Sequence, residues 1–347
     1  MMFQGCYTAL ITPMKDNGGR EVNNEALNNL VDFQAAAGVS GLLAMGTTGE
    51  SPTLNWEEHS DVIEKVKNFA QGRCTTIAGT GSNCTREAMR STHHAAEIGV
   101  DAALLVEPYY NGPSSIEIRR EYMGPLAKKY PEMEFIPYVI PGRSGTQLLP
   151  QDLAILTEQY ENINTVKEAS GDPDNMRLSR KLAPALNILS GDDDMTYLMM
   201  TDESIAARGV ISVMSNVIPG PIQQMTEAIL EGDREKGERW KKAISPLLEI
   251  VTVKTEEDTQ WGPRLCKARN PLPVKTLMNI LGMDAGPPRR PLGKMTRKGI
   301  EVVCQAALKV QNNNPEVLRP IASAFDVDIE ERLNNTDIIE ALCYSDE

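Results

Sequence analysis

The sequence lacks several features that would place the protein at a membrane or outside the cell. No apolar run reaches the roughly 18 residues that a membrane-spanning helix needs. The N-terminal segment MMFQGCYTALITP has no basic stretch followed by an apolar one, so it does not resemble a secretory signal. The six cysteines are widely spaced, without a CxxC pair or a companion histidine pattern typical of zinc. We therefore expect a cytoplasmic protein with free thiols, no metal and no cofactor.

Positive charge is also scarce. Lysine and arginine total 35 against 48 aspartates and glutamates, which gives a net charge of -13. This charge would repel phosphate backbones and anionic lipid surfaces, so we expect no nucleic-acid or membrane partner. The hydrophobic share of 41% and the charged share of 24% are close to those of ordinary soluble domains.

Eight short runs rich in apolar and β-branched residues alternate with longer stretches of helical periodicity, a pattern typical of repeated βα units. The runs begin at or near Cys6, Gly41, Thr75, Ala102, Glu134, Ile163, Asn187 and Gly209. Eight strands predict a closed (β/α)₈ TIM barrel, which we place at residues 1–232. An open doubly wound sheet fits less well, because no GxGxxG follows the first run.

After about Pro219 the strand signals stop and helical stretches take over. The sequence therefore predicts a helical C-terminal region over residues 233–310. Within it, KTEEDTQWGPRLCKAR is interpreted as an extended loop before NPLPVK. Residues 311–347 form an acidic extension, for which short docked helices and a disordered tail both remain open.

Lys167 is the first candidate for chemistry, because barrel enzymes place reactive groups at the carboxyl ends of strands. In INTVKEASGD it stands near the end of an otherwise apolar strand, where its side chain would point into the barrel mouth. A desolvated ammonium there has a lowered pKa, as an amine nucleophile toward a carbonyl requires. The alternative is a structural lysine that reaches solvent or pairs with Glu168.

Three further motifs follow strands. GTTGES, residues 46–51, forms a turn whose backbone N–H groups can converge on a carboxylate. PYYNGP brings two adjacent tyrosines, Tyr109 and Tyr110, which should face different surroundings. PYVIPGRSG offers Tyr138 as a proton shuttle and Arg143 as a two-point clamp for a carboxylate. Each of these motifs, taken alone, is compatible with a purely structural role.

In order and spacing, these motifs with LSGDD, GVISV and NPLPVK resemble the dihydrodipicolinate synthase (4-hydroxy-tetrahydrodipicolinate synthase) family of pyruvate-dependent class I aldolases and lyases. The resemblance covers about residues 3–310. It implies a lyase that condenses pyruvate with L-aspartate-4-semialdehyde through a Schiff base, in lysine and diaminopimelate synthesis.

The resemblance also implies roles for individual residues. Lys167 matches the Schiff-base lysine, and Tyr138, Thr47 and Tyr110 match a proton relay in which Tyr110 reaches the site of a neighbouring subunit. Four further positions match contacts to the substrates. Thr48 matches the residue that holds the pyruvate carboxylate, Arg143 the one that receives the carboxylate of the second substrate, and Gly191 and Ile211 backbone contacts around pyruvate.

A second set of positions matches residues that bind L-lysine in family members inhibited by it. They are Ser51, Pro52, Trp56, His59, Asn83, Glu87 and Tyr109. The sequence thus predicts lysine as an inhibitor bound at a subunit interface, although packing alone would also account for Trp56 and His59. We expect a homotetramer or a homodimer.

Val139 departs from the family, which usually carries asparagine at this position, and it places the fine geometry of the site in question. The pairs His93–His94 and Asp192–Asp193 could suggest a metal site, but adjacent residues do not easily face one ion. Two other functions stay open. One is an N-acetylneuraminate lyase or 2-keto-3-deoxy sugar acid aldolase; the other is a catalytically silent barrel with a binding or regulatory role.

Overall fold

Eight parallel strands close into a barrel in the computed structural model, which describes residues 3–344. Each strand pairs with its neighbour in sequence, and β1 pairs with β8 to close the ring. The strands are β1 (Gly5–Ala9), β2 (Gly41–Ala44), β3 (Thr75–Gly79), β4 (Ala102–Val106), β5 (Glu134–Val139), β6 (Thr165–Glu168), β7 (Asn187–Ser190) and β8 (Gly209–Ser212). The predicted TIM barrel is confirmed, with each strand inside or beside its predicted run.

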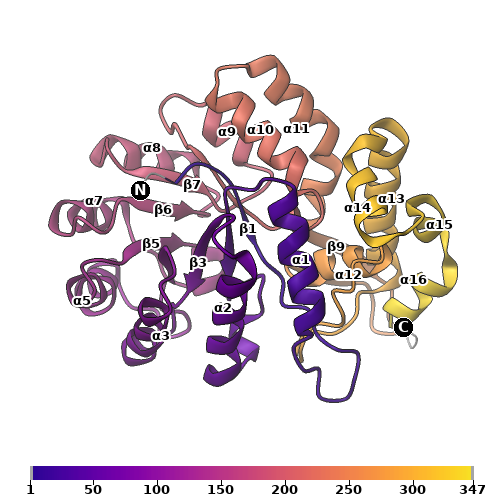
Figure 1. The fold of residues 1–347 in the computed structure, drawn as a ribbon, viewed down its shortest axis with the longest axis horizontal. Helices are drawn as coiled ribbons and strands as arrows, with labels where there is room; N and C mark the ends of the chain where they lie inside the picture. Colours follow the sequence, from indigo (N-terminus) through magenta and orange to yellow (C-terminus); the bar gives the residue numbers. More distant parts are fainter. Residues whose placement is uncertain (1–2, 345–347) are drawn as a thin grey trace.

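Helices cover the outside of the barrel (Figure 1). Several begin at residues that cap them: Asn23 accepts a hydrogen bond from the Ala26 N–H, and Asn55 forms a reciprocal capping box with Glu58. The helices are α1 (Asn24–Ala36), α2 (Trp56–Ala70), α3 (Thr85–Glu97), α4 (Ser115–Glu117), α5 (Gly124–Lys129), α6 (Pro141–Ser144), α7 (Pro150–Gln159), α8 (Pro173–Leu182), α9 (Thr196–Thr201) and α10 (Pro219–Leu230).

The barrel has two apolar layers because strand side chains alternate between its inside and its outside. The larger layer lies between strands and helices. The smaller cluster fills the interior and includes Leu43, Ile77, Leu104, Ile136, Tyr138, Leu189 and Ile211. The interior is therefore a packed core, and a reactive group can be reached only at its rim.

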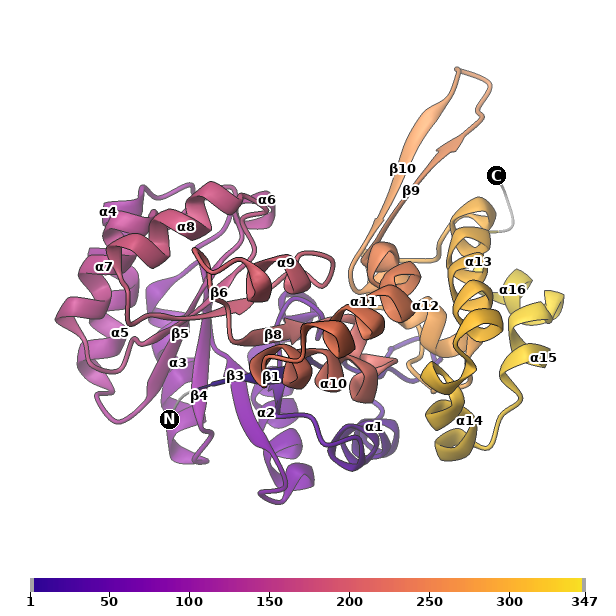
Figure 2. The same cartoon turned by 90° about the horizontal axis from the view of Figure 1, so that it is seen from above.

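The C-terminal region contains two strands that the sequence did not predict. After α11 (Arg234–Leu248), β9 (Thr252–Glu257) and β10 (Arg264–Arg269) form an antiparallel pair, which we call the ribbon. It projects well beyond the rest of the molecule (Figure 2). The prediction that strands end near Pro219 and that this segment is a loop was wrong, because the ribbon is built mainly from charged and polar residues and lacks a strand's apolar alternation.

Helices complete the chain after the ribbon. They are α12 (Leu272–Ile280), α13 (Arg297–Asn313), α14 (Arg319–Phe325), α15 (Ile329–Asn334) and α16 (Thr336–Leu342). Short helices thus occupy the acidic extension as far as it is described. Residues 1, 2 and 345–347 lie outside the described part, and the boundaries proposed at 232/233 and 310/311 stay predictions. Within residues 3–344, no helix is long and apolar enough to cross a membrane.

Candidate active site

Lys167 lies inside the barrel at the carboxyl end of β6. Its residue is only 4% exposed, and its Nζ atom stands 4.2 Å from the centre of the Tyr138 ring. The two residues are register partners on β6 and β5. Burial lowers the pKa of Lys167 to about 8, because the ammonium loses its hydration there, while negative Asp192 and Asp193 oppose the shift. About one lysine in ten is then neutral at pH 7, against fewer than one in a thousand for an ordinary lysine.

Glu168 does not pair with Lys167. Adjacent strand residues face opposite sides, and the carboxylate of Glu168 accepts hydrogen bonds from the Ser170 N–H at 2.7 Å and from Asn175 at 3.3 Å. Burial raises the pKa of Glu168 to about 7. Neither structural explanation for Lys167 fits this arrangement, because the lysine is buried and no ion pair with Glu168 forms within residues 3–344.

A cavity of about 310 Å³ opens above the interior core. Thr47, Tyr138 and Arg143 line it together, although they follow different strands. Burial raises the pKa of Tyr138 above its usual range, while the positive charge of Arg143 and a hydrogen bond with the Thr47 side chain oppose the rise. Tyr138 is therefore a protonated hydroxyl at neutral pH, able to pass a proton through Thr47.

Arg143 is held on the rim by two sets of contacts. Its Nη2 atom donates a 2.9 Å hydrogen bond to the carbonyl of Asn270. Its short helix α6 is fixed by the fully buried Glu107, which accepts hydrogen bonds from the N–H groups of Ile140 (2.9 Å) and Leu148 (2.7 Å) and from the Ser144 hydroxyl (2.8 Å). Glu107 was not among the residues predicted from the sequence, although a carboxylate that directly follows the apolar strand β4 is a signal of such a role.

The GTTGES turn is supported from the far end of the chain. The Asn270 side chain donates a 3.0 Å hydrogen bond to the Thr48 hydroxyl. Below it, Glu50 forms a 2.8 Å ion pair with Lys275 of α12, and both side chains are fully buried. Lys275 also donates to the carbonyls of Thr12 and Pro287. Asn270 and Lys275 are the first and last residues of NPLPVK, a motif whose structural role was not predicted from the sequence.

Gly191 lies beside Lys167 directly after β7, and Ile211 lies on β8. Ile211 belongs to the interior core and is fully buried. Gly191 follows β7, and a Cβ atom there would lie 2.8 Å from the Cβ of Ala169 and 3.1 Å from the Cε of Lys167. Glycine at position 191 therefore keeps free the space that the lysine side chain occupies.

We expect Gly191→Ala to displace the Lys167 side chain, because the added methyl group is too close to Cε. A misplacement of about 1 Å can cost about 100-fold in rate, and kcat should fall by that order. Steady-state kinetics and mass spectrometry of the pyruvate adduct measure the effect. Gly18→Ala is the control, since no atom lies within 4 Å of a Cβ there. Unchanged kinetics in Gly191→Ala would show that the lysine does not depend on this space.

Val139 does not enter the cavity. Its side chain belongs to the outer apolar layer, and its carbonyl accepts a 2.9 Å hydrogen bond from the Ala169 N–H. Asp193 has a structural role, since it accepts hydrogen bonds from the Ser212 hydroxyl and from the Val213 N–H. Within residues 3–344, no group of three or more His, Cys, Asp or Glu is arranged to hold a metal ion.

The two adjacent tyrosines face different surroundings. Tyr109 lines the cavity, whereas Tyr110 is 91% exposed and has a left-handed backbone with φ 78°. The Tyr110 N–H donates to the carbonyl of Ser144 at 3.3 Å, which fixes this backbone beside α6. Tyr110 thus contributes no side chain to the cavity of its own chain.

The residues predicted to bind lysine are brought together in part. Ser51, Pro52 and Tyr109 line the cavity. Burial raises the pKa of Tyr109, as does the negative charge of Glu87, and the backbone of Asn83 lies within hydrogen-bond reach. The other two predicted residues, Trp56 and His59, lie on α2 with ring centres 5.0 Å apart, and burial lowers the pKa of His59 to about 4.

The sequence is similar to known proteins over most of its length. The sequence matches the Dihydrodipicolinate synthetase family over residues 2–310. The chain belongs to this family. A relative from Methanocaldococcus jannaschii, named 4-hydroxy-tetrahydrodipicolinate synthase, is 38% identical over 298 residues, which are 86% of this chain and 95% of the relative. The resemblance predicted from the motifs is confirmed.

Solved structures of dihydrodipicolinate synthases share the fold. The Aquifex aeolicus structure has a TM-score of 0.79 at 36% identity and covers 91% of this chain and 100% of its own. The Cyanidioschyzon merolae structure, with lysine bound, has a TM-score of 0.79 at 32% identity and covers 89% of this chain and 98% of its own. The chain is thus a class I aldolase-type lyase of this family. This finding favours synthase activity over the sugar-acid lyases and the silent barrel.

Proposed function

We propose that this chain condenses pyruvate with L-aspartate-4-semialdehyde through a Schiff base on Lys167. The observation that carries the proposal is a lysine buried at the barrel mouth, with a pKa lowered to about 8, beside a buried tyrosine hydroxyl. Membership of the synthase family supports the choice of substrates.

In the first step the neutral amine of Lys167 attacks C2 of pyruvate, and the keto oxygen leaves as water. Thr48 and the backbone N–H groups of the GTTGES turn receive the pyruvate carboxylate. Gly191 and Ile211 contact the bound carbon skeleton through their backbones. Lys167 lies 4.2 Å from the ring of Tyr138, which borders the cavity, so pyruvate bound there meets the amine locally and a bimolecular encounter is replaced by a local one.

In the second step a proton leaves C3 of the Schiff base, and the resulting enamine attacks the aldehyde carbon of the second substrate. The aldehyde oxygen takes up a proton as the new bond forms. The amino group of the second substrate then attacks C2, which closes the ring and releases Lys167 as the free amine. Tyr138 and Thr47 carry protons between these atoms, since their side chains are hydrogen bonded and border the cavity. Arg143 holds the carboxylate of the second substrate.

A second copy of the chain completes the relay. Tyr110 is 91% exposed and does not line the cavity of its own chain, so its hydroxyl serves the site of a neighbouring subunit in a homodimer or homotetramer. Mixing inactive Lys167→Ala and Tyr110→Phe chains should restore activity, because each hybrid dimer then contains one intact site. Mixtures without any gain would contradict this role.

L-Lysine is the proposed inhibitor of this assembly. Glu87 and the Tyr109 hydroxyl offer partners for its ammonium and its carboxylate, and Ser51 and Pro52 border the same cavity. A relative from Cyanidioschyzon merolae has lysine bound. Millimolar lysine should lower the rate at subsaturating pyruvate, and it should fail to do so in Glu87→Gln.

The test of the function is to trap the protein with pyruvate and borohydride and then to supply the semialdehyde in a coupled reductase assay. We expect a single adduct on Lys167, followed by turnover. Its rate of formation should rise with pH through 7 and level off above about 8, because only the neutral amine reacts. Labelling without turnover would favour a sugar-acid lyase, and a protein that takes up no pyruvate would overturn the proposal.

A further inference from the structure

The ribbon carries a cluster of positive charge on its exposed face. Side chains alternate along each strand, so Lys267 and Arg269 of β10 share one face with Lys254 of β9. All three are exposed. The register places Lys254 directly opposite Lys267, and Arg269 opposite Thr252 two residue pairs nearer the base. We call Lys254, Lys267 and Arg269 the cationic strip.

This arrangement is unfavourable for the ribbon by itself. Like charges directly opposite each other destabilise a strand pair, and an isolated two-stranded ribbon is only marginally stable in water. Mutual repulsion from Arg269, Lys254 and Arg143 lowers the pKa of Lys267. Within residues 3–344, no salt bridge joins a carboxylate to Lys254, Lys267 or Arg269. The nearest acidic residue on the face, Glu256, stands opposite Leu265.

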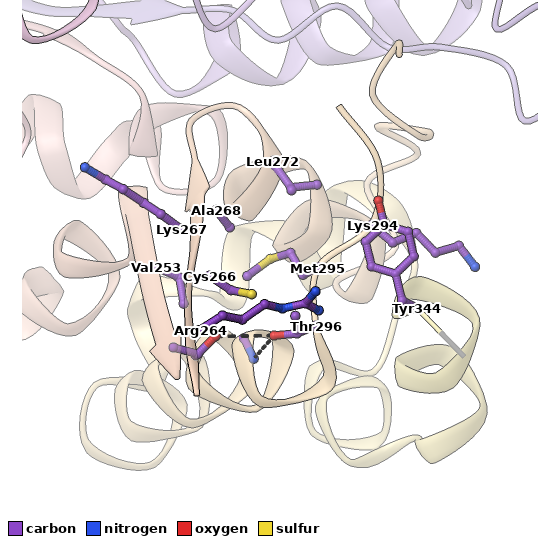
Figure 3. Close-up of a pocket in the computed structure, with 12 residues that line it drawn as sticks. Val253, Arg264, Cys266, Lys267, Ala268, Leu272, Lys294, Met295, Thr296 and Tyr344 are labelled. Carbon is purple, nitrogen blue, oxygen red and sulfur yellow. Dashed lines mark hydrogen bonds between the residues drawn. The ribbon is translucent and has the colours of Figure 1, made fainter. Parts of the chain in front are cut away.

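The other face of the ribbon has a different character. There Val253, Cys266 and Ala268 border a cavity of about 350 Å³ against Met295 (Figure 3). Lys267 extends away from these residues (Figure 3). The base of the ribbon therefore turns its inner face toward the C-terminal helices, where Val253 is buried, and leaves the cationic strip to solvent.

The base of the cationic strip is joined directly to the active-site rim. Arg269 Nη1 donates a 3.4 Å hydrogen bond to the carbonyl of Gly142, the residue before Arg143. The next residue, Asn270, accepts from Arg143 through its carbonyl and donates to Thr48 through its side chain. The strip thus continues the charge of Arg143 outward along the ribbon, in a protein whose net charge is -13.

We propose that the cationic strip is an anion-binding surface that concentrates the monoanionic 2-oxo acid pyruvate at the mouth of the barrel. A band of one sign that leads into a cavity raises the local concentration of an oppositely charged ligand. The surrounding acidic protein repels anions, so this band is a local path for them.

The inference rests on the proposed function, whose two substrates supply an internal control. Pyruvate carries one negative charge and no positive charge. L-Aspartate-4-semialdehyde is a zwitterion with an ammonium and a carboxylate, so its net charge is zero. A long-range attraction therefore acts on pyruvate and leaves the semialdehyde almost unaffected.

The experiment compares the wild type with the double variant Lys254→Gln/Lys267→Gln at low ionic strength. We expect kcat/KM for pyruvate to fall about threefold to tenfold, with little change in kcat or in kcat/KM for the semialdehyde. Raising the salt concentration should lower the wild-type kcat/KM for pyruvate toward that of the variant. The reason is that the screening length falls from about 30 Å at 0.01 M to about 3 Å at 1 M. The rate of pyruvate adduct formation under borohydride gives the same comparison without the second substrate.

The matched control is Lys128→Gln/Lys309→Gln, which removes the same charge from exposed positions on α5 and α13. The inference is wrong if kcat/KM for pyruvate falls as far in the control as in the strip variant. It is also wrong if the strip variant keeps the pyruvate kinetics and the salt dependence of the wild type. A wild-type protein that forms no adduct would overturn the proposed function instead. An equal loss for both substrates would indicate a disturbed rim and would also contradict steering by charge.

Discussion

Replacing Lys167 by methionine is expected to abolish the pyruvate adduct and to lower turnover by about 1,000-fold or more, because the variant lacks the amine that we propose as the nucleophile. The fold should become more stable at pH 7. The folded protein holds this lysine at a pKa of about 8, below its ordinary value of 10.5, so below pH 8 its protonated form destabilises the native state. Methionine removes that buried charge and keeps most of the side-chain volume.

Adduct mass, coupled turnover and thermal unfolding are measured on the same preparation. Lys167→Arg serves as the companion, since it keeps a positive charge but supplies no nucleophile, and it should be equally inactive without the gain in stability. A methionine variant that is both inactive and less stable would indicate a structural lysine, whose loss disrupts the barrel mouth.

The second large effect concerns the buried pair of Glu50 and Lys275. Lys275→Met should lower the free energy of unfolding by about 3 to 5 kcal/mol, since it leaves a carboxylate buried without its cation. The KM for pyruvate should also rise at temperatures where the variant stays folded, because Glu50 follows the Thr47–Thr48 turn. Urea unfolding and steady-state kinetics test the two consequences separately.

A double-mutant cycle separates the pair from its surroundings. Glu50→Gln/Lys275→Met removes both charges. Its loss of unfolding free energy should be clearly smaller than the sum of the losses in the two single variants. The exposed pair Glu238 and Lys242, 2.7 Å apart on α11, provides the control, and the same substitutions there should leave the free energy of unfolding almost unchanged, because solvent screens the pair. Additive losses at Glu50 and Lys275 would show that the pair does not act as a unit.

The barrel was predictable because each of its strands is a short apolar run, a signal that depends only on neighbouring residues. The ribbon was not, since its strands TVKTEE and RLCKAR pair mostly charged and polar side chains and bury little of either face. Sequence position alone also placed Lys167 and Tyr138 at the mouth. Their contact follows from the register of β5 and β6, which the motifs do not contain.

The supports of the site were harder to predict than the site itself. Glu50 and Lys275 are 225 residues apart, and no local pattern distinguishes a buried lysine in a helix from an exposed one. The resemblance to a family likewise drew attention to Val139, although its side chain points away from the cavity. Which face of a strand a residue occupies decides its effect, and this requires the closed barrel.

The hydrogen bonds from Asn270 to the GTTGES turn and from Arg143 to Asn270 bear on the order in which the protein matures during synthesis. All eight barrel strands have been made once Ser212 has left the ribosome, so the sheet can close early. Three contacts at the barrel mouth then wait for a further stretch of chain, because Thr48 and Arg143 each bond to Asn270, and Glu50 pairs with Lys275. A nascent chain that ends near residue 232 would therefore present a closed barrel that contains Lys167 and all residues lining the cavity, but that still lacks the contacts made by Asn270 and Lys275.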